Sequence, residues 1–269
     1  MKRLKTLTLA LGAAFAVSAQ AQDASVAEYR EMLSDPFANP GLLVIDRGEG
    51  LFKTPRGPKN ASLEKCDFGK GPGALKGAYA ELPRYFKDTD RVQDLESRLV
   101  TCMTTLQGFD EGEIKKKLYA DQRSNEANTD LEAIASYVAA QSADMPIKHS
   151  VAHPKEKEAA EVGEAYFWHR HGSLDFSCAT CHAKSGERIR LQDLANVYTP
   201  KEIQATMTTW PTYRVSHNVV RNLQHRMWDC HWQMRTPDVD YGSPATVALI
   251  SFLMKQADGG VLTIPGMKR

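Results

Sequence analysis

The chain lacks a charge imbalance, and after its first residues it has no long apolar run. Its 34 Lys and Arg residues nearly match its 33 Asp and Glu residues, so no strongly basic composition favours binding to nucleic acid or to an anionic membrane surface. A transmembrane helix needs about 20 consecutive apolar residues. We therefore expect neither nucleic acid nor a membrane as a partner.

Cysteine is scarce, with five in 269 residues, but two of them lie in Cys178-Ala179-Thr180-Cys181-His182. Cys-x-x-Cys-His is typical of c-type haem attachment, in which two thiols bind the porphyrin and the imidazole becomes the proximal iron ligand. A structural zinc site would need a second ligand pair, and a thioredoxin-like site a βαβ context; neither is present. We predict one covalently bound haem c, attached at Cys178 and Cys181, with His182 as proximal iron ligand.

The first 21 residues predict an export signal. Residues 1–5 are basic, Leu7–Val17 is apolar, and Ala19-Gln20-Ala21 has the small-residue spacing of a cleavage site. We expect cleavage after Ala21, and a mature protein in the periplasm of a bacterium.

The mature chain is long enough for one large or two small domains. The polar segment 142–160, interrupted by Pro146 and Pro154, is typical of a linker. We predict an N-terminal domain over residues 22–150 and a C-terminal domain over residues 151–269, each about the size of a small cytochrome.

The two predicted domains resemble each other. Residues 83–102 match residues 211–230 at a constant offset, and residues 134–138 resemble residues 249–253. Six identities could arise by chance, but their order and the shared final cysteine favour a duplication. The identical pairs are Pro83 and Pro211, Tyr85 and Tyr213, Val92 and Val220, Leu95 and Leu223, Arg98 and Arg226, and Cys102 and Cys230.

The repeat is asymmetric, because only the second half carries the haem motif. The first half has Cys66 alone upstream of Cys102. We predict a first half that is cytochrome c-like but without haem, whose two cysteines are free to form a disulfide that would help to hold a small domain without its cofactor.

The pattern of apolar residues is mainly helical. Glu156–His169 and Ser243–Lys255, with Pro244 in its first turn, suit the two crossing helices that begin and end a class I cytochrome c domain. The predicted fold class is mainly α, with two cytochrome c-like domains related by internal duplication.

The ligand on the second face of the iron decides what the haem does. Cys230 is favoured because it is the odd thiol once Cys66 and Cys102 pair, and because it follows the haem motif at a suitable distance. It could also be an inert buried thiol or pair with another chain. Other possible ligands are Met207, Met227, Met234, His217, His225 and His231.

Arg226 precedes Cys230 by four residues, so on a helix both lie on one face. A guanidinium there can bind a sulfur oxyanion through two donors and would favour the thiolate of Cys230. Haem propionates could also take one or two of the neighbouring arginines. The basic residues around it include Arg214, Arg221 and Arg235, against one acid, Asp229.

Several motifs together are more specific than the haem motif alone. They are Gly71-Pro72-Gly73, the segment from Gly77 to Tyr85, residues 94–99, Trp210-Pro211-x-Tyr213-Arg214, and Leu223-Gln224-x-Arg226 before Cys230. Through them, essentially the whole mature chain resembles the A subunits of the SoxAX cytochrome c complex, from the bacterial thiosulfate-oxidising (Sox) system.

The resemblance implies two cytochrome c-like domains and, since the first haem motif is missing, the single-haem branch of the family. It implies a Cys66–Cys102 disulfide where two-haem relatives bind their first haem. It also implies that Cys230, often a persulfide in this family, is the distal iron ligand, and that Arg226 is the catalytic arginine.

The implied activity is that of an L-cysteine S-thiosulfotransferase. Thiosulfate is attached oxidatively to a cysteine of the carrier protein SoxYZ, giving a cysteine S-thiosulfonate, and electrons pass to the cytochrome SoxX. The main alternative is a non-catalytic periplasmic electron-transfer cytochrome c with methionine ligation. Two others are a subunit that only docks a partner, and a sensor or peroxidase with an open sixth position.

Overall fold

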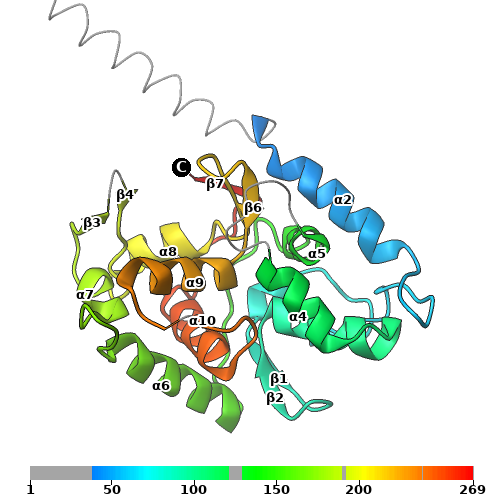
Figure 1. Ribbon diagram of the computed structural model, residues 1–269, viewed down its shortest axis with the longest axis horizontal. Helices are drawn as coiled ribbons and strands as arrows, with labels where there is room; N and C mark the ends of the chain where they lie inside the picture. Colours follow the sequence, from blue (N-terminus) through cyan, green and yellow to red (C-terminus); the bar gives the residue numbers. More distant parts are fainter. Residues whose placement is uncertain (1–37, 121–128, 190–191, 238, 269) are drawn as a thin grey trace, which may run out of the picture. The chain divides into compact units, whose positions relative to one another are not determined.

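The structure is a computed structural model that describes residues 38–120, 129–189, 192–237 and 239–268 (Figure 1). The predicted export signal, residues 1–21, and its cleavage site after Ala21 lie outside this range. Within it, no helix has both the length and the apolar character to cross a bilayer.

Helices dominate the described residues, which confirms the mainly α prediction. In chain order the helices are α2 (Gly41–Lys53), the 3-10 helix η2 (Tyr79–Glu81), α3 (Leu95–Cys102), the π-helical turn η3 (Met103–Gln107), α4 (Glu111–Ala120), α5 (Asp130–Ala140), α6 (Pro154–Trp168), α7 (Cys178–His182), α8 (Pro200–Met207), α9 (Leu223–Met234) and α10 (Pro244–Gln256). The short strands are β1 (Arg84–Phe86), β2 (Arg91–Gln93), β3 (Arg188–Ile189), β4 (Gln192–Asp193), β5 (Thr212–Arg214), β6 (Val219–Arg221) and β7 (Gly266–Lys268). β1 pairs with β2, β3 with β4, and β5 lies between β6 and β7.

Helices α6 and α10 pack against each other, as the sequence predicts for the haem-motif half (Figure 1). A glycine allows their close approach, because a Cβ on Gly163 would lie 2.0 Å from the carbonyl oxygen of Ala248. Helices α2 and α5 pack in the same way in the first half, where a Cβ on Gly48 would lie 2.0 Å from the carbonyl oxygen of Ala133.

Gly48→Ala should lower the free energy of unfolding by about 2–3 kcal/mol, because the added methyl group would force α2 away from α5. Gly50→Ala is the matched control on the same helix. A Cβ there meets no atom within 4 Å, so this substitution should stabilise by up to about 1 kcal/mol through helix propensity. Urea unfolding followed by circular dichroism measures both, and equal effects would contradict the close helix crossing.

The hairpin and helix at the centre of each half have the same layout. Hairpin β1–β2 leads into α3, and hairpin β5–β6 leads into α9. Arg84 at the start of β1 corresponds to Thr212 in β5, and Leu95 at the start of α3 corresponds to Leu223 in α9, a shift of 128 residues in each case. The structural shift equals the sequence offset of the repeat.

The turn inside each hairpin is also the same. Asp90 and Asn218 occupy the left-handed region with φ of 54° and 57°, a conformation that Asp and Asn tolerate better than most residues. The hydroxyl of Tyr85 donates to Asp90 Oδ1 at 2.9 Å, and that of Tyr213 donates to Asn218 Oδ1 at 2.5 Å.

The segment predicted as a linker is shorter and more tightly packed than expected. Helix α6 already begins at Pro154, where proline loses no helical hydrogen bond. The preceding chain pairs with the segment after α10: Ile147 N donates to Gly260 O at 2.8 Å, and Leu262 N donates to Met145 O at 2.9 Å. Because Ile147 is fully buried, this connection is part of the core rather than a free tether.

Two buried polar contacts join the halves. Gln224 at the start of α9 donates to Asp94, the N-cap of α3, at 2.6 Å. Arg221 at the end of β6 forms an ion pair with Glu132 of α5 at 3.3 Å, and both side chains are almost fully buried. A buried charge is costly unless it is paired, so these contacts fix how α9 lies against the first half.

Candidate functional site

Helix α7 is a single turn that presents the two thiols of the haem motif. Ser177 caps its N-terminus: the Ser177 hydroxyl accepts from Thr180 N at 3.3 Å, and the Thr180 hydroxyl accepts from Ser177 N at 3.0 Å. Residues three apart lie on one helix face, so Cys178 and Cys181 both reach the same cavity.

The next residue, His182, is oriented by the main chain. Its Nδ1 lies 2.9 Å from the carbonyl oxygen of Ala195. A carbonyl can only accept, so Nδ1 carries the proton and Nε2 keeps its lone pair. This is the tautomer in which an imidazole binds a metal through Nε2.

Helix α9 supplies the opposite wall. Asn222 caps it by accepting from His225 N at 2.9 Å, and Arg226 and Cys230 share one face, as their spacing predicts. The side chains of Cys230 and His182 both line the cavity and interact electrostatically with each other. The two residues predicted as axial ligands therefore face each other.

A cavity lies between α7 and α9. A haem needs apolar walls for its macrocycle, two thiols near its edge and one donor on each face, and the residues present fit that requirement. The apolar residues of the walls are Phe167, Ile189, Leu194, Ala195, Val197, Ile203, Met207, Trp210, Leu223, Met227, Met234, Leu249 and Leu253.

The alternative ligands are placed less well than Cys230. His231 lines the cavity, but Tyr166 lies 2.8 Å from its Nε2 and the carbonyl oxygen of Met227 lies 2.7 Å from its Nδ1, so both ring nitrogens are engaged. His217 and His225 do not line the cavity. The predicted methionines Met207, Met227 and Met234 do line it, yet the residue that meets His182 is Cys230.

The electrostatic environment separates Cys230 from the other free thiols. Burial favours its neutral form, but the Arg226 guanidinium and the His182 imidazole outweigh burial and lower the pKa of Cys230. Burial, and then the charge of Cys230, raise the pKa of Cys178 to about 12 and also raise the pKa of Cys181. Cys230 is thus the thiol of this cavity poised to be a thiolate.

The four arginines predicted around Cys230 divide into two groups. Arg226 faces the thiol and donates to Asp229 Oδ2 at 2.6 Å, and Arg214 also interacts with Cys230. The other two have other partners. Arg221 is buried and paired with Glu132 of the first half, and Arg235, in the left-handed conformation after α9, lies exposed over the Trp232 ring at 4.8 Å.

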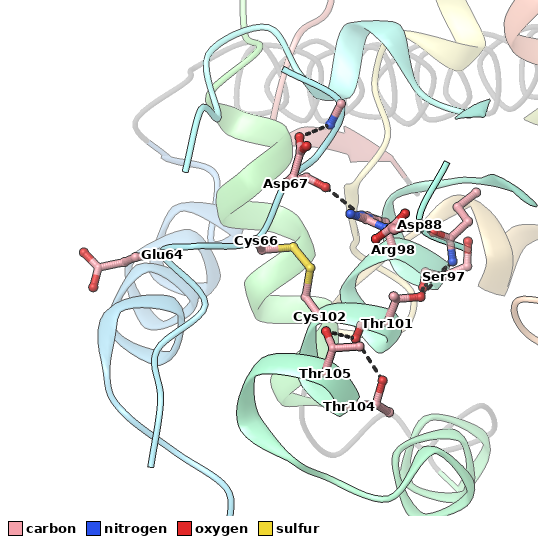
Figure 2. Close-up of a disulfide and its surroundings, with 12 residues drawn as sticks. Glu64, Cys66, Asp67, Asp88, Ser97, Arg98, Thr101, Cys102, Thr104 and Thr105 are labelled. Carbon is pink, nitrogen blue, oxygen red and sulfur yellow. Dashed lines mark hydrogen bonds and ion pairs between the residues drawn. A yellow bond between two sulfur atoms is a disulfide. The ribbon is translucent and has the colours of Figure 1, made fainter. Parts of the chain in front are cut away.

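In the first half, the predicted disulfide is confirmed. Cys66 and Cys102 are bonded with a Cα–Cα distance of 5.6 Å, and both are buried (Figure 2). Arg98, which matches Arg226 in the repeat, donates to Asp88 at 2.8 Å and to the carbonyl oxygen of Asp67 at 2.6 Å. The arginine and sulfur that face a cavity in the second half are therefore both engaged in the first.

Sequence reasoning missed Lys268. Strand β7 pairs with β5 and places the Lys268 ammonium 5.5 Å from the centre of the ring of Trp210, which lines the cavity. No local signal marks this residue, since it lies in a short segment far from the haem motif and is brought there only by strand pairing.

Comparisons with known proteins find relatives over almost the whole chain. The L-cysteine S-thiosulfotransferase subunit SoxA of Hydrogenophilus thermoluteolus is 46% identical over 245 residues, which cover 91% of this chain and 88% of that protein. A SoxA subunit of Hydrogenobacter thermophilus is 34% identical over 277 residues, covering 100% of both chains.

A chain in the crystal structure of SoxXA from P. pantotrophus has the same fold, with a TM-score of 0.70 and 24% identity, over 89% of this chain and 83% of that one. The family model described as SoxA/TsdA, cytochrome c domain, matches residues 47–147, within the half that lacks the haem motif. From these similarities, the chain belongs to the SoxA family of L-cysteine S-thiosulfotransferase subunits.

Proposed function

We propose that this chain is the cytochrome subunit that joins thiosulfate oxidatively to a cysteine of the SoxYZ carrier. The observation that carries the proposal is the placement of Arg226 and Cys230 on one face of α9, opposite His182 and beside the Cys178–Cys181 pair. In the overall reaction, thiosulfate and a carrier thiol give a cysteine S-thiosulfonate, one proton and two electrons. The electrons pass to the cytochrome SoxX.

Membership of the family gives the chain a c-type haem. We infer that Cys178 and Cys181 would hold it covalently and that His182 and Cys230 would bind its iron. When bound, the haem supplies a one-electron redox centre whose potential a thiolate ligand lowers. The apolar walls of the cavity keep water away from it.

The chain's own residues supply the group transfer. Arg226 attracts the anionic substrate and holds Cys230 as a thiolate. The outer sulfur of thiosulfate bonds to the sulfur of Cys230 with loss of two electrons. The carrier thiolate then attacks that outer sulfur and takes the sulfonate-bearing group, which leaves Cys230 as a thiolate again.

We infer that the halves, divided near residues 150 and 151, are cytochrome c-like domains related by duplication, and that the first has lost its haem. Three observations support this: the constant shift of 128 residues, the glycine-mediated helix crossing in each half, and the match of residues 47–147 to a cytochrome c domain. In this alignment of the halves, Cys102 corresponds to Cys230 and Arg98 corresponds to Arg226. Cys102 is bonded to Cys66, and Arg98 donates a hydrogen bond to Asp88.

The proposed partner and compartment also have support. Four exposed apolar side chains lie on the segments flanking the haem motif: Trp168, Leu174, Phe176 and Tyr198. Exposed apolar side chains favour protein contacts, so this surface is suitable for docking SoxX close to the haem. The predicted export signal and the disulfide fit the periplasm, an oxidising compartment.

Arg226→Gln should reduce SoxYZ-dependent thiosulfate oxidation about a hundredfold, because a charged donor is lost next to the reacting sulfur. The assay follows SoxX reduction with purified carrier and the holoprotein. Arg235→Gln, at the residue that follows the same helix, is the control, because Arg235 is exposed and lies over the Trp232 ring. A subunit that only docks a partner would retain near-normal turnover with Arg226→Gln, and that result would reject the proposal.

A further inference from the structure

The positive charge of Arg226 is already compensated. Its guanidinium donates to Asp229 at 2.6 Å and also faces the Cys230 sulfur. Thiosulfate is a dianion at neutral pH. A site that brings it next to a thiolate needs positive charge beyond that of Arg226.

Strands β5 and β7 carry two further cationic residues near Arg226, namely Arg214 and Lys268. The two strands pair in parallel, with Arg214 opposite Lys268 at the end of the ladder. Directly paired residues of neighbouring strands point to the same face of the sheet. The Lys268 ammonium lies 5.5 Å from the Trp210 ring centre and donates to the carbonyl oxygen of Thr206 at 3.2 Å. Trp210 and Thr206 both line the cavity, so Lys268 contacts two residues of its wall.

Neither cation forms a direct ion pair with a protein carboxylate among the described residues. Within the ranges that the structure describes, the Arg214 guanidinium makes no ion pair or side-chain hydrogen bond, and Lys268 donates only to a main-chain carbonyl. Both side chains are half-buried. A partly desolvated cation without an anion is unfavourable.

The two cations also repel each other and Arg226. Burial, then Arg214 and Arg226, lower the pKa of Lys268 to about 8. Burial, then Arg226, lower the pKa of Arg214, whereas Asp229 and Cys230 oppose the shift. Asp229 and Cys230 offset this repulsion only in part, and an anion bound between the two cations would relieve it further.

We propose that Arg214 and Lys268 form a sulfonate-binding subsite beside the cavity, next to Arg226. The three sulfonate oxygens of thiosulfate accept hydrogen bonds from the two side chains, and the outer sulfur is directed toward Cys230. The assignment rests on the proposed function of Cys230. In this proposal Lys268 and Arg214 bind the substrate, and neither residue takes part in the redox step.

The test measures thiosulfate binding and turnover separately, on the holoprotein. Lys268→Met and Arg214→Gln should each weaken thiosulfate binding about tenfold in isothermal titration calorimetry without carrier, since each removes charge-assisted hydrogen bonds. In the SoxYZ assay the KM for thiosulfate should rise by a similar factor, while kcat changes little. Lys268→Arg should keep most of the affinity. Lys201→Met, an exposed lysine of α8, is the charge-matched control and should bind as wild type.

Two results would overturn the subsite. One is wild-type affinity in both Lys268→Met and Arg214→Gln. The other is unchanged thiosulfate affinity together with altered haem content or visible spectrum, which would assign these cations to the haem propionates. If the wild-type protein binds thiosulfate but shows no turnover with SoxYZ, the proposed function is wrong. The calorimetric comparison of the variants still tests whether Arg214 and Lys268 bind thiosulfate.

Discussion

Cys230→Ser should abolish SoxYZ-dependent thiosulfate oxidation, with a loss of roughly 10⁴-fold. Serine cannot form the sulfur–sulfur bond, and removing a nucleophile costs at least this much in enzymes where it has been dissected. The visible and electron paramagnetic resonance spectra should change at the same time, because a serine hydroxyl is a much weaker iron ligand than a thiolate. Turnover is measured through SoxX reduction, and ligation on the purified ferric protein.

The controls for this result come from the same cavity. Intact mass should show one haem in both wild type and Cys230→Ser, because Cys178 and Cys181 are untouched. Leucine at each methionine position should leave the spectra unchanged; the variants are Met207→Leu, Met227→Leu and Met234→Leu, since all three side chains line the cavity. A spectrum that responds to one of these but not to Cys230→Ser would identify an ordinary electron-transfer cytochrome.

The double variant Cys66→Ala/Cys102→Ala should lose about 4 kcal/mol of unfolding free energy. The bond closes a loop with a sequence separation of 36, and the entropy that such a closure removes from the unfolded chain corresponds to this value. For a chain of this size the melting temperature should fall by roughly 10 °C. Differential scanning calorimetry of the holoprotein measures it.

The same double variant should retain its haem spectrum and its turnover at 25 °C, because the disulfide lies in the first half and lines no part of the haem cavity. Full reduction of the wild-type disulfide with dithiothreitol should reproduce the lowered melting temperature. If the melting temperature is unchanged, or if haem is lost at 25 °C, the disulfide is not an independent support of the first half.

Features that depend on local sequence were predicted correctly. Pro244 begins α10 as expected, and α6 contains most of the helix expected at Glu156–His169. The four-residue spacing of Arg226 and Cys230 puts them on one face of α9. Capping residues, helical periodicity and spacing carry this information within one or two turns.

Features that depend on distant contacts were missed. Arg221 belonged to the predicted basic surroundings of Cys230, but Glu132 of the other half pairs with it. Lys268 contacts Trp210, a residue of the cavity wall, only because β7 joins β5. The sequence shows which charged residues are present, but strand pairing and the packing of the two halves determine which of them come into contact.

The burial of the Cys66–Cys102 bond has a consequence for maturation. The proposed haem attachment would consume Cys178 and Cys181 as thiols, so a reductant would have to act on this chain while the Cys66–Cys102 bond survives. A thiolate breaks a disulfide only by direct attack on sulfur. The bond is shielded, with its cysteines 1% and 3% exposed, whereas Cys178 and Cys181 remain partly accessible. We therefore expect the first half to fold before the proposed cofactor insertion begins, so that the buried bond stays oxidised while Cys178 and Cys181 are reduced.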